Sequence, residues 1–288
     1  MSEVQDIQWF PGHMARTRRQ IQSSLKLIDA VVEVVDARIP YSSRNPEVPQ
    51  LTQGKPRLVL LNKCDVADKE ITAQWVEYYK KQGIPALAVD SKNGTGLFAF
   101  VPAVKALLAD KLERNAAKGI NKTLRLMVVG IPNCGKSSFI NRMVRTVKAK
   151  VEDRPGVTRG NQWFSIAGGI DLLDTPGVLW PKFDDKIVGE RLAFTGAIRD
   201  NILDIESLAM RFIESIPSRY INSFIERYKL EDITDMGSYE VLELVARKRG
   251  MLVSRGEYDT ERAAIMLLDE FRAAKIARIS LELPEKEV

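Results

Sequence analysis

The segment Gly130-Ile131-Pro132-Asn133-Cys134-Gly135-Lys136-Ser137 has the residue types and the spacing of a phosphate-binding loop. Gly130 and Gly135 can adopt backbone torsions that residues with a β-carbon avoid, so successive N–H groups can curl around a phosphate at the positive end of the next helix. Lys136 would reach the β- and γ-phosphates, and the Ser137 hydroxyl would hold Mg²⁺. The alternative is a glycine-containing turn that matches the pattern by chance. The predicted contacts of the phosphates are Asn133, Cys134, Gly135, Lys136, Ser137 and Ser138.

The tetrad Asn62-Lys63-Cys64-Asp65 follows a predicted buried strand and could select the base. The Asp65 carboxylate can accept hydrogen bonds from the N1–H and the exocyclic amine of guanine, a pair of donors that adenine lacks. Charge-assisted bonds contribute about 1.5–3 kcal/mol each, so the pair would favour GTP over ATP by roughly 10²–10⁴. By itself such a tetrad is often a surface loop. Its place after a strand, in a chain with a phosphate loop, favours guanine recognition by Asn62, Lys63 and Asp65.

Two further segments complete the predicted nucleotide site. Ser91-Lys92-Asn93 resembles the segment that lies against the guanine base, although the usual Ser-Ala-Lys is matched imperfectly. In the turn Asp174-Thr175-Pro176-Gly177 we expect Asp174 to hold Mg²⁺ through water and the N–H of Gly177 to contact the γ-phosphate. Thr158 is the predicted second Mg²⁺ ligand, from a first mobile switch. Loss of the γ-phosphate would release both switch segments.

The residue after this turn bears on catalysis. Val178 stands where Ras-like enzymes have the glutamine that orients the attacking water. Valine forms no hydrogen bond with water, so intrinsic hydrolysis should be slow and another group must complete the site. Asn133 is one candidate, because it occupies the loop position that helps to hold K⁺ in potassium-dependent GTPases of similar sequence. The catalytic residues predicted from these motifs are Lys136, Thr158 and Gly177.

Alternating strands and helices must position the motifs. Short runs of branched and apolar residues predict strands at 30–35, 57–61, 86–89, 124–129, 162–166 and 170–173. Between them, helices are predicted at 69–81 with Asp68 as the N-cap, at about 97–115, and after the phosphate loop. This alternation predicts an α/β fold, a mostly parallel sheet with helices on both faces.

The character of the chain changes near residue 184, where strand signals end. Helices are predicted at 186–197, 204–215, 218–228, 238–249 and 260–274, with Pro217, Gly237 and Gly250 between them. We therefore expect a nucleotide-binding domain at residues 1–180 and a small all-helical domain at residues 181–288.

Composition and charge narrow the class of protein. The net charge of +5 and the pI near 9.1 hint at a nucleic-acid partner. The best candidates for phosphate contacts in the helical domain are Arg247, Lys248, Arg249, Arg255 and Arg262, although each of them, taken singly, fits a solvated helix end better. The sequence contains no apparent membrane span or signal peptide, and two cysteines are too few for a disulfide framework or a zinc site. We expect a cytoplasmic monomer.

The order of the motifs is that of a circularly permuted GTPase. Ras-like GTPases run from the phosphate loop through Asp-x-x-Gly to Asn-Lys-x-Asp and Ser-Ala-Lys, and here the last two come first. Closely spaced termini let a domain be recut in this way without a change of packing. This order, with Trp9-Phe10-Pro11-Gly12-His13-Met14, Asp36-Ala37-Arg38-Ile39-Pro40 and the helical tail, resembles the permuted GTPases of the ribosome biogenesis GTPase A group over essentially the whole chain.

This resemblance implies a bacterial cytoplasmic GTPase that binds the large ribosomal subunit and its rRNA and acts in late maturation of that subunit. It implies turnover of GTP to GDP that is slow unless the ribosome stimulates it, and it makes His13 a catalytic candidate. An imidazole is well suited to position water at neutral pH. His13 could instead be a surface or docking residue. The implied cofactors are GTP or GDP, Mg²⁺ and K⁺.

Two other functions stay open at this point. One is a regulatory GTP-binding switch whose helical domain recruits a protein, with no link to the ribosome. The other is an ATP-using enzyme with a phosphate loop. The helical domain follows the Asp-x-x-Gly turn within about ten residues. Whether the protein is a ribosomal GTPase or a regulatory GTP-binding switch, a change at Gly177 could therefore pass to the helical domain directly.

Overall fold

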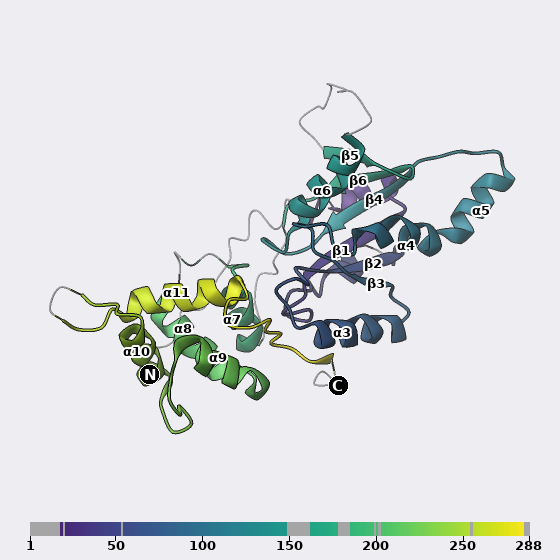
Figure 1. The fold of residues 1–288 in the computed structure, drawn as a ribbon. Coiled ribbons are helices and arrows are strands. Elements are labelled where there is room, and N and C mark those ends of the chain that lie inside the picture. The colour runs from purple at the N-terminus through teal and green to yellow at the C-terminus, as the bar shows by residue number, and fades with distance from the viewer. Residues whose placement is uncertain are drawn as a thin grey trace.

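A computed structural model of the chain describes residues 18–19, 21–52, 54–148, 162–177, 185–198, 200, 203–253 and 256–284. His13, Thr158, Val178 and Arg255 lie outside the described residues, as does the boundary that the sequence suggests near residue 180. Figure 1 shows an α/β part, which ends at residue 177, beside a helical part, which begins at residue 185.

The α/β part is built on a six-stranded sheet with the order β3-β2-β1-β4-β6-β5. Its strands are β1 (Ala30–Asp36), β2 (Arg57–Asn62), β3 (Ala86–Ala88), β4 (Leu124–Val129), β5 (Gln162–Ile166) and β6 (Ile170–Asp174). All neighbouring pairs are parallel except β5 with β6, which is an antiparallel hairpin at one edge. Every residue of β1 is buried, as a central strand covered on both faces must be.

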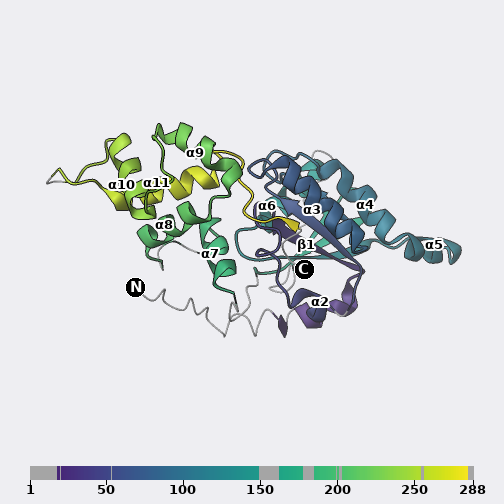
Figure 2. The same cartoon turned by 90° about the horizontal axis from the view of Figure 1, so that it is seen from below.

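Helices cover the two faces of the sheet. Figure 2 shows α3 (Lys69–Lys81) and α4 (Phe100–Leu107) on one side and the short α2 (Val48–Leu51) on the other. On the α2 side, a small apolar cluster forms around Ile21, Leu25, Val48 and Met127, and η1 (Leu25–Leu27) belongs to it. The Asp68 carboxylate accepts from the backbone N–H groups of Glu70 and Ile71, which confirms the predicted N-cap of α3.

The helix predicted at 97–115 is divided. It forms η2 (Leu97–Ala99), α4 and α5 (Ala109–Ala117), with a break at Leu108. The side chain of Leu108 is buried, whereas α5 buries none of its own residues and projects from the sheet. The apolar pattern of the sequence therefore continues across the break, but only α4 packs on the core.

The helical part contains α7 (Lys186–Phe194), α8 (Ile205–Ser215), η4 (Ser218–Tyr220), α9 (Ile221–Tyr228), α10 (Ser238–Lys248) and α11 (Thr260–Arg272). These elements lie within one or a few residues of the helices predicted from the sequence. Contacts between aromatic rings join three of them, because Phe212 lies edge-to-face 5.4 Å from Phe194 and, tilted, 4.6 Å from Phe271 between ring centroids. No helix in the described part of the chain has both the length and the apolar character to cross a membrane.

Residues 276–284, the C-terminal strap, return from α11 to the α/β part (Figures 1 and 2). The backbone N–H of Leu281 donates to the carbonyl oxygen of Arg38 at 2.9 Å. The Glu282 carboxylate is buried and accepts from the backbone N–H groups of Tyr41 and Ser42 at 2.7 and 3.1 Å, and Arg191 of α7 pairs with it at 3.0 Å. The strap therefore binds both parts at once.

Candidate functional site

The predicted motifs within the described residues lie close together at the carboxyl ends of the sheet strands. The tetrad 62–65 follows β2, the segment 91–93 follows β3, the phosphate loop follows β4, and the turn 174–177 begins at the end of β6. These four strands are parallel, so all four loops lie at the carboxyl ends of their strands. Ligands of open α/β sheets bind at this edge.

Asn62 joins three of the loops. Its side-chain amide donates to the carbonyl oxygen of Cys134 at 2.8 Å, and its amide oxygen accepts the backbone N–H of Ser91 at 3.0 Å. Asn62 is 2% exposed, so both bonds are shielded from water. The tetrad 62–65 and the phosphate loop are thus directly joined, although the tetrad comes first in the chain.

The phosphate loop, which runs into α6 (Lys136–Lys148), is shaped by close backbone contacts. Gly135 has φ +97°, and a β-carbon there would lie 2.2 Å from the amide nitrogen of Asn62. Any side chain at this position would break the Asn62 bridge. Lys136 is buried, and its ammonium group donates to the carbonyl oxygens of Gly130 and Ile131 at 3.1 and 2.8 Å. The loop's own backbone therefore holds the lysine in place.

The loop after β3 is organised by Asp90, for which the sequence suggested no role. One oxygen of its carboxylate accepts from the backbone N–H groups of Lys92 and Asn93 at 2.8 and 3.1 Å. The other oxygen accepts from the Asn93 amide at 2.7 Å. The side chain of Asn93 therefore turns back into its own loop, while the Ser91 hydroxyl is buried without a hydrogen-bond partner. An Asp three residues before the Asn in a tight loop was the available signal.

Asp174 has the features of a metal ligand. One of its carboxylate oxygens is buried without a hydrogen-bond partner. Burial raises the pKa of Asp174, and the charge of Lys136 offsets part of that rise. Mg²⁺ prefers hard oxygen donors, so this free carboxylate oxygen and the hydroxyl of Ser137 fit the metal by their chemistry. Gly177 lies against the phosphate loop, since a β-carbon there would be 2.8 Å from the Pro132 nitrogen.

Asn133 and Cys134 occupy different surroundings. Asn133 has φ +57°, and its side-chain amide donates to the carbonyl oxygen of Gly196, just after α7, at 2.8 Å. The phosphate loop thus touches the helical part through the residue predicted to hold K⁺. The thiol of Cys134 is buried, and burial raises its pKa. Cys134 can therefore contribute its backbone to the loop, whereas alkylation of the thiol requires the loop to open.

Asp65 lies beside these loops but enters none of their hydrogen bonds. Its neighbour Cys64 donates its backbone N–H to Val89 at 3.2 Å, which fixes the tetrad beside β3. Lys63 has φ +60° and pairs with Asp36 at 2.9 Å. Arg142 of α6 donates to the backbone oxygen of Asn93. The sequence analysis predicted neither Asp36 nor Arg142 as a site residue.

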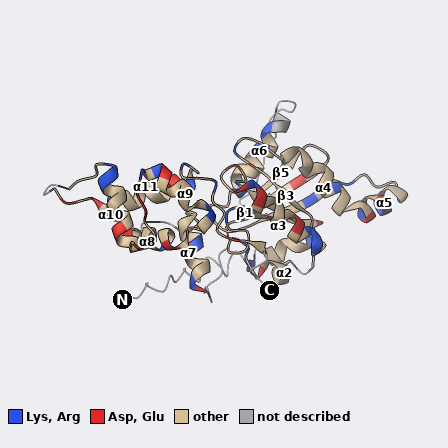
Figure 3. Cartoon of the chain, turned by 60° about the horizontal axis from the view of Figure 1, so that its bottom comes forward, with Lys and Arg blue, Asp and Glu red and all other residues tan. Residues whose placement is uncertain are grey.

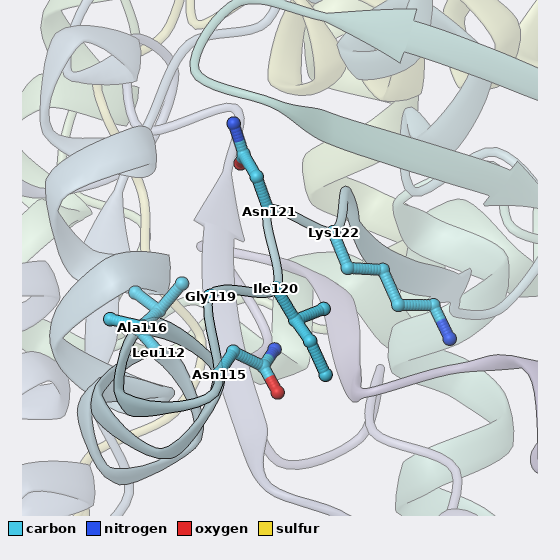
Figure 4. A pocket seen from close by; sticks show the side chains of 7 residues that line it. All are labelled: Leu112, Asn115, Ala116, Gly119, Ile120, Asn121 and Lys122. Carbon is cyan, nitrogen blue, oxygen red and sulfur yellow. The ribbon is translucent and has the colours of Figure 1, made fainter.

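A separate hollow of about 380 Å³ lies between α5 and the start of β4 (Figure 4). It is lined by Leu112, Asn115, Ala116, Gly119, Ile120, Asn121 and Lys122. None of the motif residues lines it, so it is not part of the candidate site.

Comparison with known proteins identifies the family. A family model described as 50S ribosome-binding GTPase matches residues 125–232. Ribosome biogenesis GTPase A of Priestia megaterium is 47% identical over 282 residues, which cover 97% of this chain and 98% of that protein. The chain belongs to the ribosome biogenesis GTPase A family. The member of this family from Thermotoga maritima is 33% identical over 277 residues, which cover 96% of this chain and 94% of that protein.

This chain is also similar to a mitochondrial protein and to two solved structures. Mouse mitochondrial ribosome-associated GTPase 1 is 33% identical over 299 residues, covering 95% of this chain and 89% of that protein. A crystal structure of GNP-bound YlqF from Thermotoga maritima matches with a TM-score of 0.64 at 30% identity, over 94% of this chain and 99% of that one. A GDP-bound YlqF structure has a TM-score of 0.66, also at 30% identity, over 93% of this chain and 100% of that one.

Membership of the ribosome biogenesis GTPase A family confirms the predicted fold and the predicted activity. The chain is a GTPase with a mostly parallel sheet, in circularly permuted order, followed by helices. The GTPase family model begins to match at β4 because the segments before β4 in this chain come last in an unpermuted GTPase.

Proposed function

We propose that this GTPase acts in late maturation of the large ribosomal subunit, and that it binds the rRNA of that subunit through its helical part. The observation that carries the proposal is the Asn62 bridge, which joins the segments proposed to bind the guanine base and the phosphates. The names of its relatives, ribosome biogenesis GTPase A and mitochondrial ribosome-associated GTPase 1, support the link to the ribosome. We propose that it works in the cytoplasm as a monomer.

In the proposed site, Asp65 binds the guanine base, and Asn62, Lys63, Ser91 and Lys92 form its surroundings. Asn93 contributes by fixing the loop through Asp90. The phosphates lie in the loop from Asn133 to Ser138, where Lys136 neutralises the β- and γ-phosphates. A bound Mg²⁺ would neutralise charge between the β- and γ-phosphates, and Ser137, Thr158 and Asp174 would hold it.

Hydrolysis in this site is proposed to be slow until other groups complete it. Gly177 offers its N–H to the γ-phosphate, and His13 positions the attacking water when the ribosome is bound. The test is His13→Ala, for which GTP affinity should be unchanged while ribosome-stimulated turnover falls. Unchanged stimulated turnover would remove His13 from the mechanism.

K⁺ is proposed to bind beside Asn133. The bond from the Asn133 amide to Gly196 supports this proposal, because it fixes the orientation of a side chain that would otherwise rotate. Turnover should be faster in KCl than in NaCl at equal ionic strength, and Asn133→Ala should remove that difference. Equal rates of the unaltered protein in both salts would exclude a K⁺ site.

The end of α10 supports the RNA-binding proposal. Arg247 and Lys248 are exposed there, and in Figure 3 the ribbon of α10 is blue, the colour of Lys and Arg, at one end. Arg249 is less available, because it pairs with Glu270 at 3.7 Å and its guanidinium lies 5.2 Å from the Tyr228 ring. We therefore assign the main phosphate contacts to Arg247 and Lys248, with Arg262 at the start of α11.

Co-sedimentation with large ribosomal subunits tests the function. The protein should sediment with the subunit in the presence of a non-hydrolysable GTP analogue and less with GDP. The double variant Arg247→Ala and Lys248→Ala should bind more weakly and show a salt slope smaller by about one to two. Lys80→Ala with Lys81→Ala, at the exposed end of α3, is the matched control. Absence of co-sedimentation in both nucleotide states would favour the alternative, a regulatory switch that recruits a protein.

A further inference from the structure

The segment Asp36-Ala37-Arg38-Ile39-Pro40 begins with the last residue of the central strand β1, and only Asp36, as the partner of Lys63, belongs to the site described above. Asp36 ends β1, between the ends of β2 and β4 that carry the base-selecting tetrad and the phosphate loop. Asp36 and Arg38 are 2% and 1% exposed. Charged groups so deeply buried must be paired, and their partners show what they connect.

Asp36 holds two cations at the same time. Arg38 donates to both of its carboxylate oxygens, through Nε to Oδ1 at 2.9 Å and through Nη2 to Oδ2 at 2.7 Å. The ammonium group of Lys63 lies 2.9 Å from the same Oδ2. Burial by itself would raise the pKa of Asp36, but Arg38 and Lys63 hold it below its ordinary value, so the group stays a carboxylate. Lys63 and Arg38 therefore share one oxygen atom.

Arg38 also contacts three elements outside the α/β part. Its Nη2 donates to the carbonyl oxygen of Thr195 at the end of α7, at 3.4 Å. Its guanidinium lies 5.2 Å from the ring centroid of Phe271 in α11, and its carbonyl oxygen accepts the N–H of Leu281 in the C-terminal strap. The side chain that fixes Asp36 is thus itself fixed by the helical part.

We propose that Arg38 is a positioning residue of the nucleotide site, which acts through Asp36 to place Lys63 and which makes that placement depend on the docked helical part. The inference rests on the proposed role of Lys63 in the nucleotide site. Without Arg38, the buried carboxylate has Lys63 as its one counter-ion, so Lys63 is drawn to Asp36 and loses its fixed place beside the nucleotide. By linkage, a nucleotide that engages Lys63 stabilises the contacts of Arg38 with the helical part by the same factor.

The test measures binding of a fluorescent GDP analogue to the full chain without ribosomes. Arg38→Gln keeps a hydrogen-bonding side chain but removes the charge, and it should weaken nucleotide binding about tenfold, although Arg38 does not reach the nucleotide. Arg38→Lys keeps the charge and should recover part of the loss. If Arg38→Gln does not fold, the comparison of Arg38→Lys with the unaltered protein carries the test, with a weakening of about threefold expected.

Arg191→Gln is the matched control. Arg191 of α7 also pairs with a buried carboxylate, that of Glu282 in the C-terminal strap. Its replacement leaves every contact of Arg38 in place. This variant should lose stability and keep its nucleotide affinity within about twofold. A weakening equal to that of Arg38→Gln would contradict a specific role of Arg38.

Two further measurements separate the inference from the function on which it rests. Lys63→Met should weaken nucleotide binding, and the double variant with Arg38→Gln should be no weaker than Lys63→Met alone, because both changes remove the same interaction. If Lys63→Met has no effect, the proposed site is wrong. If Lys63→Met weakens binding while the Arg38 variants only lower the thermal midpoint, the site stands and the role of Arg38 is purely structural.

Hydrogen exchange at the backbone amide of Leu281 should slow on nucleotide addition, and the slowing should be lost in Arg38→Gln.

Discussion

Arg142, in the helix after the phosphate loop, donates through its guanidinium to the backbone oxygen of Asn93, in the loop after β3. The same guanidinium covers Gly94, where a β-carbon would lie 2.9 Å from Nε. The loop proposed to contact the base is therefore fastened to the helix whose first turn belongs to the phosphate loop. This contact therefore links the two segments that are proposed to bind opposite ends of the nucleotide.

Arg142→Ala should weaken binding of GDP and GTP by about threefold to tenfold, since one charged hydrogen bond to the base loop is lost. Affinity measured with a fluorescent GDP analogue is the test. Arg145→Ala, one turn further along α6 and exposed, is the control and should change affinity little. If the two variants behave alike, Arg142 has no part in holding the base loop.

Asp65→Asn should shift base preference from guanine to xanthine nucleotides. The amide replaces one acceptor with a donor, so it repels the exocyclic amine of guanine and donates to the oxygen that xanthine has in its place. We expect a loss of about 10²-fold in GTP affinity. Turnover of GTP and of xanthosine triphosphate is the measurement. Undiminished use of GTP by the variant would place base selection elsewhere.

Asp174→Asn should separate stability from activity. The pKa of Asp174 is raised from 3.8 by burial, so its ionised form costs stability, and this cost grows as pH rises from about 4 through the raised pKa. At pH 7 the nucleotide-free variant should thus be at least as stable as the unaltered protein. Mg²⁺-dependent GTP turnover should nevertheless fall by about 10²-fold or more, since a metal ligand is lost. A clear drop in thermal midpoint without ligand would show that Asp174 supports the fold.

Glu282→Ala should destabilise the full chain by about 2–4 kcal/mol. The change leaves Arg191 and two backbone N–H groups of the loop 41–42 without their acceptor. Urea unfolding gives the free energy. Glu243→Ala, at an exposed position of α10, should stay within about 0.5 kcal/mol. Equal stability of the two variants would mean that the strap contributes little to the fold.

Local patterns were sufficient to predict the strands, the helices and the four nucleotide motifs. Each motif lies at the end of a strand or within a few residues after it, and a strand, a loop and the next helix are neighbours in sequence. The helix at 97–115 was predicted as one piece because its apolar spacing runs through Leu108, and the spacing contains no information on how far the core extends. The N-cap at Asp68 needed only its own first turn to be recognised.

The contacts that join distant segments could not be predicted in this way. The cluster of Asp36, Arg38 and Lys63 depends on two strands that pair side by side, and its link to Thr195 depends on how the helical part docks. The role of Glu282 is equally hidden, because a short irregular strap has neither a helical nor a strand period. Asn133 looked like a residue of the phosphate loop alone, yet its amide also reaches Gly196.

The contacts of the C-terminal strap constrain the order in which this protein can fold as it is synthesised. The sheet and its loops emerge first, but the loop at Tyr41 and Ser42 receives its acceptor from Glu282, which emerges after the last helix. In a nascent chain, the contacts between the strap and the loop beside Arg38 can therefore form only after residue 282 has been synthesised. Until then, the α/β part lacks the segment that joins it to the helical part.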